Sequence, residues 1–274
     1  MDKPRDLIAN GKDLTPGMLE QCLVDAEDYY TAIIDLRYVG WIEPYSLVAL
    51  AVFVQSQTLQ DRLPRLTAPY DHTKANYLAR MGVGEMIVSF GGQHDLPHVR
   101  RNDVGSALLE LKRFDSEEAA DELAVMVYDK VVHTDPVAAS ALHQSISELG
   151  QNVEQHSGRS NGFIAAQTTF KDSRVTFAIG DAGMGLLGSL QAMGFGDDED
   201  VLEAVMLGGV TSTGDAGRGN GFRTARDLLT GKGGSLYAQT GVASRKEFAN
   251  GRVDAARHPG MYVRGTLLQG AVDY

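Results

Sequence analysis

The chain is poor in cysteine and in basic residues. It contains one cysteine, Cys22, so no intramolecular disulfide can form, as is typical of proteins from a reducing compartment. Lys and Arg number 25 against 36 Asp and Glu, which gives a formal net charge of -11 and a pI of about 5.0. Nucleic-acid duplexes are bound through basic surfaces, so this composition disfavours a nucleic-acid partner.

The chain also lacks a long apolar run. Its most apolar stretch, Leu47 to Val54, is far too short to span a bilayer, and the first residues do not combine a basic start with an apolar segment. A soluble, cytoplasmic protein without membrane partners is therefore expected. The apolar content of 43% supports a substantial core, and 274 residues suit one large or two ordinary domains.

Two familiar phosphate-binding fingerprints are missing. There is no Gly-x4-Gly-Lys-Ser/Thr, which excludes a P-loop. The Gly-x-Gly-x-Gly of Gly217, Gly219 and Gly221 differs from the dinucleotide fingerprint Gly-x-Gly-x-x-Gly, and it follows no strand of a Rossmann unit. The chain has instead three polar blocks in order, beginning at Glu148, Asp181 and Gly217.

The first block is predicted on a long helix that begins at Pro136. Glu148, Asn152 and His156 follow one another at every fourth position, so they share a slowly winding face beside the apolar stripe of the helix. Any one of them alone would ordinarily be a satisfied core residue or a solvated charge. A carboxamide oxygen one turn from a carboxylate also suits Mg²⁺, which prefers oxygen ligands and keeps several waters.

The second and third blocks are rich in glycine. Asp181 ends a predicted buried strand, where a carboxylate needs a donor, either a backbone turn or an exocyclic amine such as that of adenine. Gly183 and Gly185 permit close approach of a flat base or form a turn. Residues 211–222 form a hydroxyl- and glycine-rich loop that opens a helix, where unpaired N–H groups attract phosphate; a mobile surface loop is the alternative.

In this order the blocks resemble the GHKL family of ATP-binding domains, which includes gyrase B, histidine kinases, MutL and the anti-sigma-factor serine kinases. Glu148 to His156 resembles the family's N box, Asp181 to Gly185 its first glycine box, and Gly217 to Gly221 its second. Gly265-Thr266 resembles the final Gly-Thr. The resemblance covers about residues 105 to 274.

The resemblance implies ATP and Mg²⁺ as cofactors and assigns roles to single residues. Asn152 would hold Mg²⁺, Asp181 would accept a hydrogen bond from the adenine amine, and Glu148 would be the catalytic general base. The other nucleotide-binding residues that it implies, around the base and in a lid over the phosphates, are His156, Gly183, Gly185, Gly217, Arg218, Gly219, Gly221 and Thr266.

A second resemblance concerns the N-terminal part. Residues 32–36, 41–47, 66–68 and 78–82 are similar to a STAS domain, the fold of anti-sigma-factor antagonists. Those antagonists read Asp-Ser-Ser-Gly-Leu where this chain has Glu-Pro-Tyr-Ser-Leu, so the phosphorylated hydroxyl would fall at Tyr45, with Ser46 one place later. This departure implies a unit kept for docking or as a scaffold.

The expected fold is α/β in two parts. Residues 1–92 would form a STAS-like α/β domain, 93–104 a linker, and 105–274 a GHKL domain of the Bergerat type, an α+β sandwich with a mixed, mainly antiparallel sheet covered by helices on one face. Residues 242–259 look like an insertion before the last strand. The other predicted helices lie at 44–54, 75–81, 117–131 and 223–229, and strands at 30–36, 65–68, 107–114, 162–170, 175–181, 234–240 and 260–269.

Three functions remain open at this point. The first is an ATP-binding regulatory protein, a Mg²⁺-dependent ATPase or an anti-sigma-type serine/threonine kinase with a protein partner as regulator or phosphoacceptor. The second is a non-catalytic scaffold in which ATP only switches the conformation. The third is a histidine kinase, which needs a phosphoacceptor on a dimerisation helix, whereas His94, His98 and His133 stand in turn-like contexts. A homodimer is one expected assembly.

Overall fold

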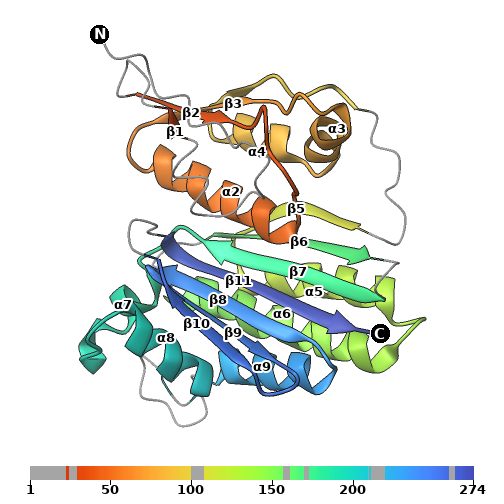
Figure 1. Cartoon of the computed structure of the whole chain (residues 1–274), viewed down its shortest axis with the longest axis vertical. Coiled ribbons are helices and arrows are strands. Elements are labelled where there is room, and N and C mark those ends of the chain that lie inside the picture. Colours follow the sequence, from red (N-terminus) through yellow and green to blue (C-terminus); the bar gives the residue numbers. More distant parts are fainter. Residues whose placement is uncertain are drawn as a thin grey trace.

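The computed structural model describes residues 23–24, 30–99, 108–156, 161–169, 173–208, 210, 220–258 and 263–274, with the backbone alone at 23–24, 108, 154–156 and 169. Calls on other residues, among them Gly217, Arg218 and Gly219, lie outside this part of the chain. The described residues form a mixed α/β structure with two sheets (Figure 1).

The first sheet is small and mostly parallel. Its strand order is β1-β2-β3-β4, in which β2, β3 and β4 are parallel and β1 pairs antiparallel with β2. Its strands are β1 (Leu23–Val24), β2 (Thr31–Asp35), β3 (Leu63–Thr67) and β4 (Gln93–His94). Helix α2 (Pro44–Thr58) connects β2 to β3, and α3 (His72–Arg80) and α4 (Val83–Ser89) connect β3 to β4. Strand β4 falls within the expected linker and belongs to this sheet.

The second sheet has seven strands in the order β10-β9-β8-β11-β7-β6-β5, and each neighbouring pair is antiparallel. It is thus wholly antiparallel where a mixed, mainly antiparallel sheet was expected. In chain order the strands are β5 (Leu108–Phe114), β6 (Gly162–Thr169), β7 (Arg174–Asp181), β8 (Ser235–Gly241), β9 (Ala243–Phe248), β10 (Val253–Arg257) and β11 (Val263–Asp273).

Helices cover one face of the seven-stranded sheet. These are α5 (Glu117–Val131), α6 (Pro136–His156), α7 (Gly185–Ser189), α8 (Asp198–Leu207) and α9 (Gly221–Gly231), with a 3-10 turn η2 (Gln191–Met193) after α7. Local capping fixes the two long ones. Ser116 accepts from the N–H of Ala119 at the start of α5, and Asp135 accepts from two N–H groups at the start of α6, where Pro136 needs no donor.

The opposite face of the seven-stranded sheet is covered by α2. This helix lies between the two sheets (Figure 1), and all but the last of its 15 residues are buried. Its apolar residues share one core with those of the first sheet and with Phe163, Ala178 and Leu267 of the second. A helix that is apolar all round must be buried on all sides. The helix was predicted at residues 44–54 and extends to Thr58. No helix in the described ranges is long and apolar enough to cross a membrane.

Strands of the central sheet consequently carry two buried faces. Along β7, Phe177 and Ile179 belong to the core under the helices, whereas Ala178, and Ala182 just after the strand, belong to the core around α2. Small residues on the α2 side let the helix approach closely, and a Cβ at Gly180 would lie 3.0 Å from a methyl group of Val48. Successive side chains of a strand point to opposite faces of the sheet, so α2 and the helix layer pack on opposite faces of the same strands.

A polar bridge joins α2 to the sheet within this apolar contact. The hydroxyl of Tyr45 donates to Oε1 of Gln239 at 2.8 Å, and the hydroxyl of Tyr237 donates to the same oxygen at 2.9 Å. The two tyrosine rings meet edge to face with centroids 5.3 Å apart. Burial raises the pKa of Tyr45 well above its ordinary value, so the phenol stays protonated and acts as a donor.

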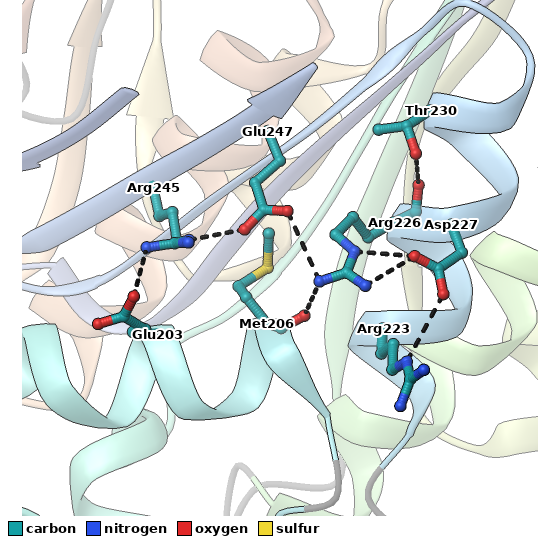
Figure 2. A network of polar contacts seen from close by, with 8 residues as sticks. All are labelled: Glu203, Met206, Arg223, Arg226, Asp227, Thr230, Arg245 and Glu247. Carbon is teal, nitrogen blue, oxygen red and sulfur yellow. Dashed lines mark hydrogen bonds and ion pairs between the residues drawn. The ribbon is translucent and has the colours of Figure 1, made fainter. Parts of the chain in front are cut away.

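A second polar network, drawn in Figure 2, ties α8 and α9 to β9. Arg226 of α9 donates to the carbonyl of Met206 at 2.7 Å, and its guanidinium lies 3.6 Å from a carboxylate oxygen of Glu247. Glu247 also accepts from Arg245 at 2.7 Å, which in turn reaches Glu203 at 3.2 Å. The network fixes the two helices that flank residues 209–219 in the sequence against one strand.

Residues 242–259, predicted as an insertion before the last strand, lie in the sequence between β8 and β11. They contain β9 and β10, which extend the seven-stranded sheet beyond β8. Strand β9 carries Arg245, Lys246 and Glu247 in succession, and every residue of β10 is exposed, so neither strand shows the alternation of apolar and polar residues that predicts a strand. Helices α4 and α8 were also missed by the sequence analysis.

The bridge at Gln239 predicts a measurable loss when one hydroxyl is removed. Tyr45→Phe keeps the ring in place and deletes one buried hydrogen bond, so the free energy of unfolding should fall by about 1 kcal/mol. Urea denaturation measures this, with Tyr38→Phe as control because the ring of Tyr38 is 44% exposed. Equal midpoints for the two variants would contradict the bridge.

Candidate functional site

Three polar side chains form a row across neighbouring strands of the central sheet. Thr266 of β11 pairs with Asp181 at the end of β7 and with Thr240 near the end of β8. Residues directly opposite one another in a sheet point to the same face, so the three side chains lie on one side. Phe177 and Ile179 of β7 pack into the core beneath the helices, and Asp181 continues their alternation. The row therefore lies under the helix layer.

Asp181 is a buried carboxylate with a strongly perturbed pKa. Its side chain is only 3% exposed. Burial raises the pKa of Asp181 to about 7, although hydrogen bonds from the backbone N–H groups of Gly183 and Thr266 lower it in part. The N–H of Gly183 lies 2.7 Å from Oδ1. The carboxylate is thus incompletely compensated, and a further hydrogen-bond donor would favour its charged form.

Helix α6 brings two residues of the first block to the same place. Glu148 and Asn152 are half-buried beside the stripe of Leu149 and Val153, as predicted. The amide nitrogen of Asn152 donates to the carbonyl of Glu148 at 2.9 Å, so its amide oxygen is the atom that would bind a cation. Groups of three or more His, Cys, Asp or Glu that could hold a metal are absent from the described part of the chain.

The start of α9 presses against these two side chains. A Cβ at Gly221 would lie 2.7 Å from the amide nitrogen of Asn152 and 3.1 Å from Oε2 of Glu148. A side chain at this position would require the ends of both side chains to shift, so glycine favours the close approach. The last glycine of the third block is therefore in contact with the first block.

A pocket lies among the three blocks. Asn152, Asp181 and Thr266 line it together with Gly185 and the apolar residues Leu149, Val153, Leu186, Phe222 and Leu268 and the hydroxyl residue Ser189. About 20 Å³ is wide enough for water, and the open depression around it measures about 320 Å³. Ligand pockets ordinarily measure roughly 300–1,000 Å³. The 20 Å³ that admits water is far smaller, so neighbouring side chains must move before a nucleotide base fits.

The structure thus brings together most of the predicted site residues that it describes. Glu148 and Asn152 lie on α6, Asp181 and Gly183 at the end of β7, Gly185 and Gly221 at the starts of α7 and α9, and Thr266 on β11. His156 is the last residue of α6, and its side chain is outside the described part. Gly217, Arg218 and Gly219 also lie outside it.

The two hydroxyls at the phosphoacceptor position of the STAS resemblance are inaccessible. Tyr45 is 6% exposed and holds Gln239, and Ser46 is 2% exposed. The hydroxyl of Ser46 accepts from the N–H of Glu43 at 3.3 Å, as part of the cap of α2. Phosphorylation of either residue would require α2 to leave the seven-stranded sheet.

The three histidines considered as phosphoacceptors also lie in unsuitable places. His133 is in the turn between α5 and α6, His94 is in the short strand β4, and His98 is in the loop that follows. None of them is on a helix, whereas a histidine kinase presents its phosphoacceptor on a dimerisation helix.

Sequence reasoning missed Thr240 as a member of the site. The strand that carries it was predicted to end at this residue. Thr240 is placed beside Asp181 only through its pairing with Thr266, which lies 26 positions further along the chain. The strand of Thr266 also has a register shift between Val263 and Thr266. A hydroxyl at the end of a predicted strand was the available signal.

No family model matches the chain, and no curated protein is significantly similar to it in sequence.

The raised pKa of Asp181 predicts how stability depends on pH. The folded state holds this proton up to about pH 7 and the unfolded state only to about 3.8, so the folded state carries the extra proton between these values. The contribution of Asp181 to stability is therefore lost as pH rises from 4 through 7, by up to about 1.4 kcal/mol per pH unit.

Urea unfolding of the wild type and of Asp181→Asn at pH 4 to 8 tests this dependence. The difference between their free energies of unfolding should move in favour of the variant as pH rises and should level off above about pH 8. A difference that stays constant over the whole range would show that Asp181 titrates normally.

Proposed function

We propose that this protein binds Mg²⁺-ATP in a GHKL-type site and acts as a regulatory ATPase or as a serine/threonine protein kinase of the anti-sigma type. The observation that carries the proposal is the buried, incompletely compensated Asp181 beside a pocket that all three polar blocks line or adjoin. An adenine exocyclic amine is a donor of the right kind for this carboxylate. Gly183 and Gly185 then pass alongside the base.

The phosphate end of the nucleotide is assigned to the opposite end of the pocket. Asn152 lines the pocket, and Gly221, at the start of α9, lies against it. One amide oxygen is a sparse ligand set, and it suits a Mg²⁺ ion that takes most of its ligands from phosphates and water. Bound in this way, Mg²⁺ supplies charge neutralisation at the phosphates.

Glu148 is assigned the role of general base. It lies one helical turn before Asn152, so a carboxylate and a metal-binding oxygen share one face of α6. A carboxylate in this place can accept the proton of a water or of a substrate hydroxyl as it attacks the terminal phosphate.

The N-terminal part is assigned a scaffold or docking role in the same proposal. It resembles a STAS domain, and its order of β2, α2, β3, α3, α4 and β4, with parallel β2, β3 and β4, is compatible with that fold. Tyr45 and Ser46 are buried, so the proposal assigns the phosphoacceptor of a kinase to another protein.

The first test is calorimetric titration of Mg²⁺-ATP into the wild type and into Asp181→Ala. Saturable binding is expected in the wild type, and at least a hundredfold weaker binding in the variant, since the base loses its hydrogen-bond partner in a buried site. Asp129→Ala, an exposed aspartate on α5, is the matched control and should bind normally. Absence of binding to the wild type would remove the proposal.

A second test separates catalysis from switching. Glu148→Gln keeps the size of the side chain and removes the base, so Mg²⁺-ATP binding should stay within about threefold of wild type while phosphate release or phosphotransfer falls about a hundredfold or more. Radiolabelled ATP follows both reactions. If the wild type binds ATP and neither releases nor transfers phosphate, the non-catalytic switch replaces the enzyme.

A further inference from the structure

The hydroxyl of Thr240 is fully buried at the end of the polar row. Thr240 is 0% exposed, and the residues that line the pocket do not include it. It therefore lies behind the site, next to Thr266 in the sheet and two strands from Asp181. A buried hydroxyl at this place needs hydrogen-bond partners.

Its partners are the backbones of two segments that are far apart in the sequence. The hydroxyl oxygen accepts from the N–H of Leu186 at 3.1 Å and donates to the carbonyl of Gly265 at 3.1 Å. Leu186 follows the first glycine box, and Gly265 precedes Thr266. The side chain of Thr240 thus holds the segment after the first glycine box against the Gly265–Thr266 segment.

The contact at the glycine box is tight. Gly185 has φ of +71°, and a Cβ on it would lie 2.9 Å from the hydroxyl oxygen of Thr240 and 3.2 Å from the carbonyl oxygen of Gly265. Glycine is the residue that adopts this conformation readily and leaves the space open. The backbone of the box therefore rests directly on the hydroxyl and carbonyl.

The strand that carries Thr240 is itself fixed from the other face. Gln239, its neighbour, points to the opposite side of the sheet and accepts from both Tyr45 and Tyr237. Helix α2 thus anchors β8 immediately beside Thr240. A support fixed on both faces can hold a hydroxyl to within a few tenths of an ångström.

We propose that Thr240 is a positioning residue for the nucleotide base: its hydroxyl sets the spacing between the first glycine box and the Gly265–Thr266 segment, and so the width of the slot beside Asp181. This inference rests on the proposed ATP site, because the slot matters only if a base enters it. Thr240 acts through the two backbones that it holds and does not touch the ligand.

The test compares Thr240→Val with Thr240→Ser. Valine keeps the shape and removes the hydroxyl, so the dissociation constant for Mg²⁺-ATP should rise about tenfold, as for the loss of a buried hydrogen bond. Serine keeps the hydroxyl and should bind within about twofold of wild type. Thr58→Val is the matched control, because the hydroxyl of Thr58 only donates to Val54 within α2.

Amide hydrogen exchange in the nucleotide-free protein gives a readout that does not need ATP. The N–H of Leu186 loses its acceptor in Thr240→Val and should exchange about tenfold faster, while Thr240→Ser stays close to wild type. If Thr240→Val folds poorly, Thr240→Ala takes its place with the same expectations.

The outcomes separate this inference from the ATP-site proposal. Wild-type binding together with unchanged affinity in Thr240→Val would overturn the positioning role and leave ATP binding intact. A loss of affinity that serine does not restore would also overturn it, since a defect of packing alone behaves in this way. If the wild type binds no ATP, the ATP-site proposal fails. Unchanged exchange of the Leu186 N–H in Thr240→Val would then show that the hydroxyl of Thr240 does not hold this backbone.

Discussion

The burial of helix α2 between two sheets is the constraint on which the rest of the structure depends. An antiparallel sheet with helices on one face ordinarily leaves its other face to solvent, and its strands then alternate between apolar and polar residues. Here α2 covers that face, so the central strands are apolar on both sides and the helix is apolar all round. The N-terminal and C-terminal parts therefore share a core, and neither contact surface suits exposure to water.

This shared core bears directly on the candidate site. Asp181 and Thr266 point to the helix layer, while the residues that follow them in the chain, Ala182 and Leu267, pack in the core around α2. The polar row thus stands on strands that are fixed from behind. A site built on strands held on both faces keeps its geometry better than one built on loops. Burial of α2 also makes the hydroxyls of Tyr45 and Ser46 inaccessible, because both residues belong to this helix.

The sequence predicted the elements whose signals are local. Helix α5 was predicted with both ends correct, because Ser116 caps it and its apolar stripe is regular. Helical spacing placed Glu148 and Asn152 on one face, whereas their grouping with Asp181 in one site was implied by the resemblance to GHKL domains. Strands β9 and β10 were missed, because β9 is stabilised by pairing with β8, and β10 by pairing with β9, and not by their own pattern. The role of Thr240 depends likewise on register, which a single sequence does not reveal.

Asp181 is the residue of the site whose charged form is destabilised by burial. A carboxylate with two backbone donors in a buried place is still short of the solvation that it has in water, and its raised pKa measures the shortfall. A ligand that donates to the charged form relieves it, so binding, ionisation and folding become linked quantities. Near neutral pH such a ligand displaces the proton from Asp181, and its apparent affinity then weakens as pH falls. The pocket beside Asp181 is nearly closed. Its apolar lining residues are more stable in contact with one another than in contact with water.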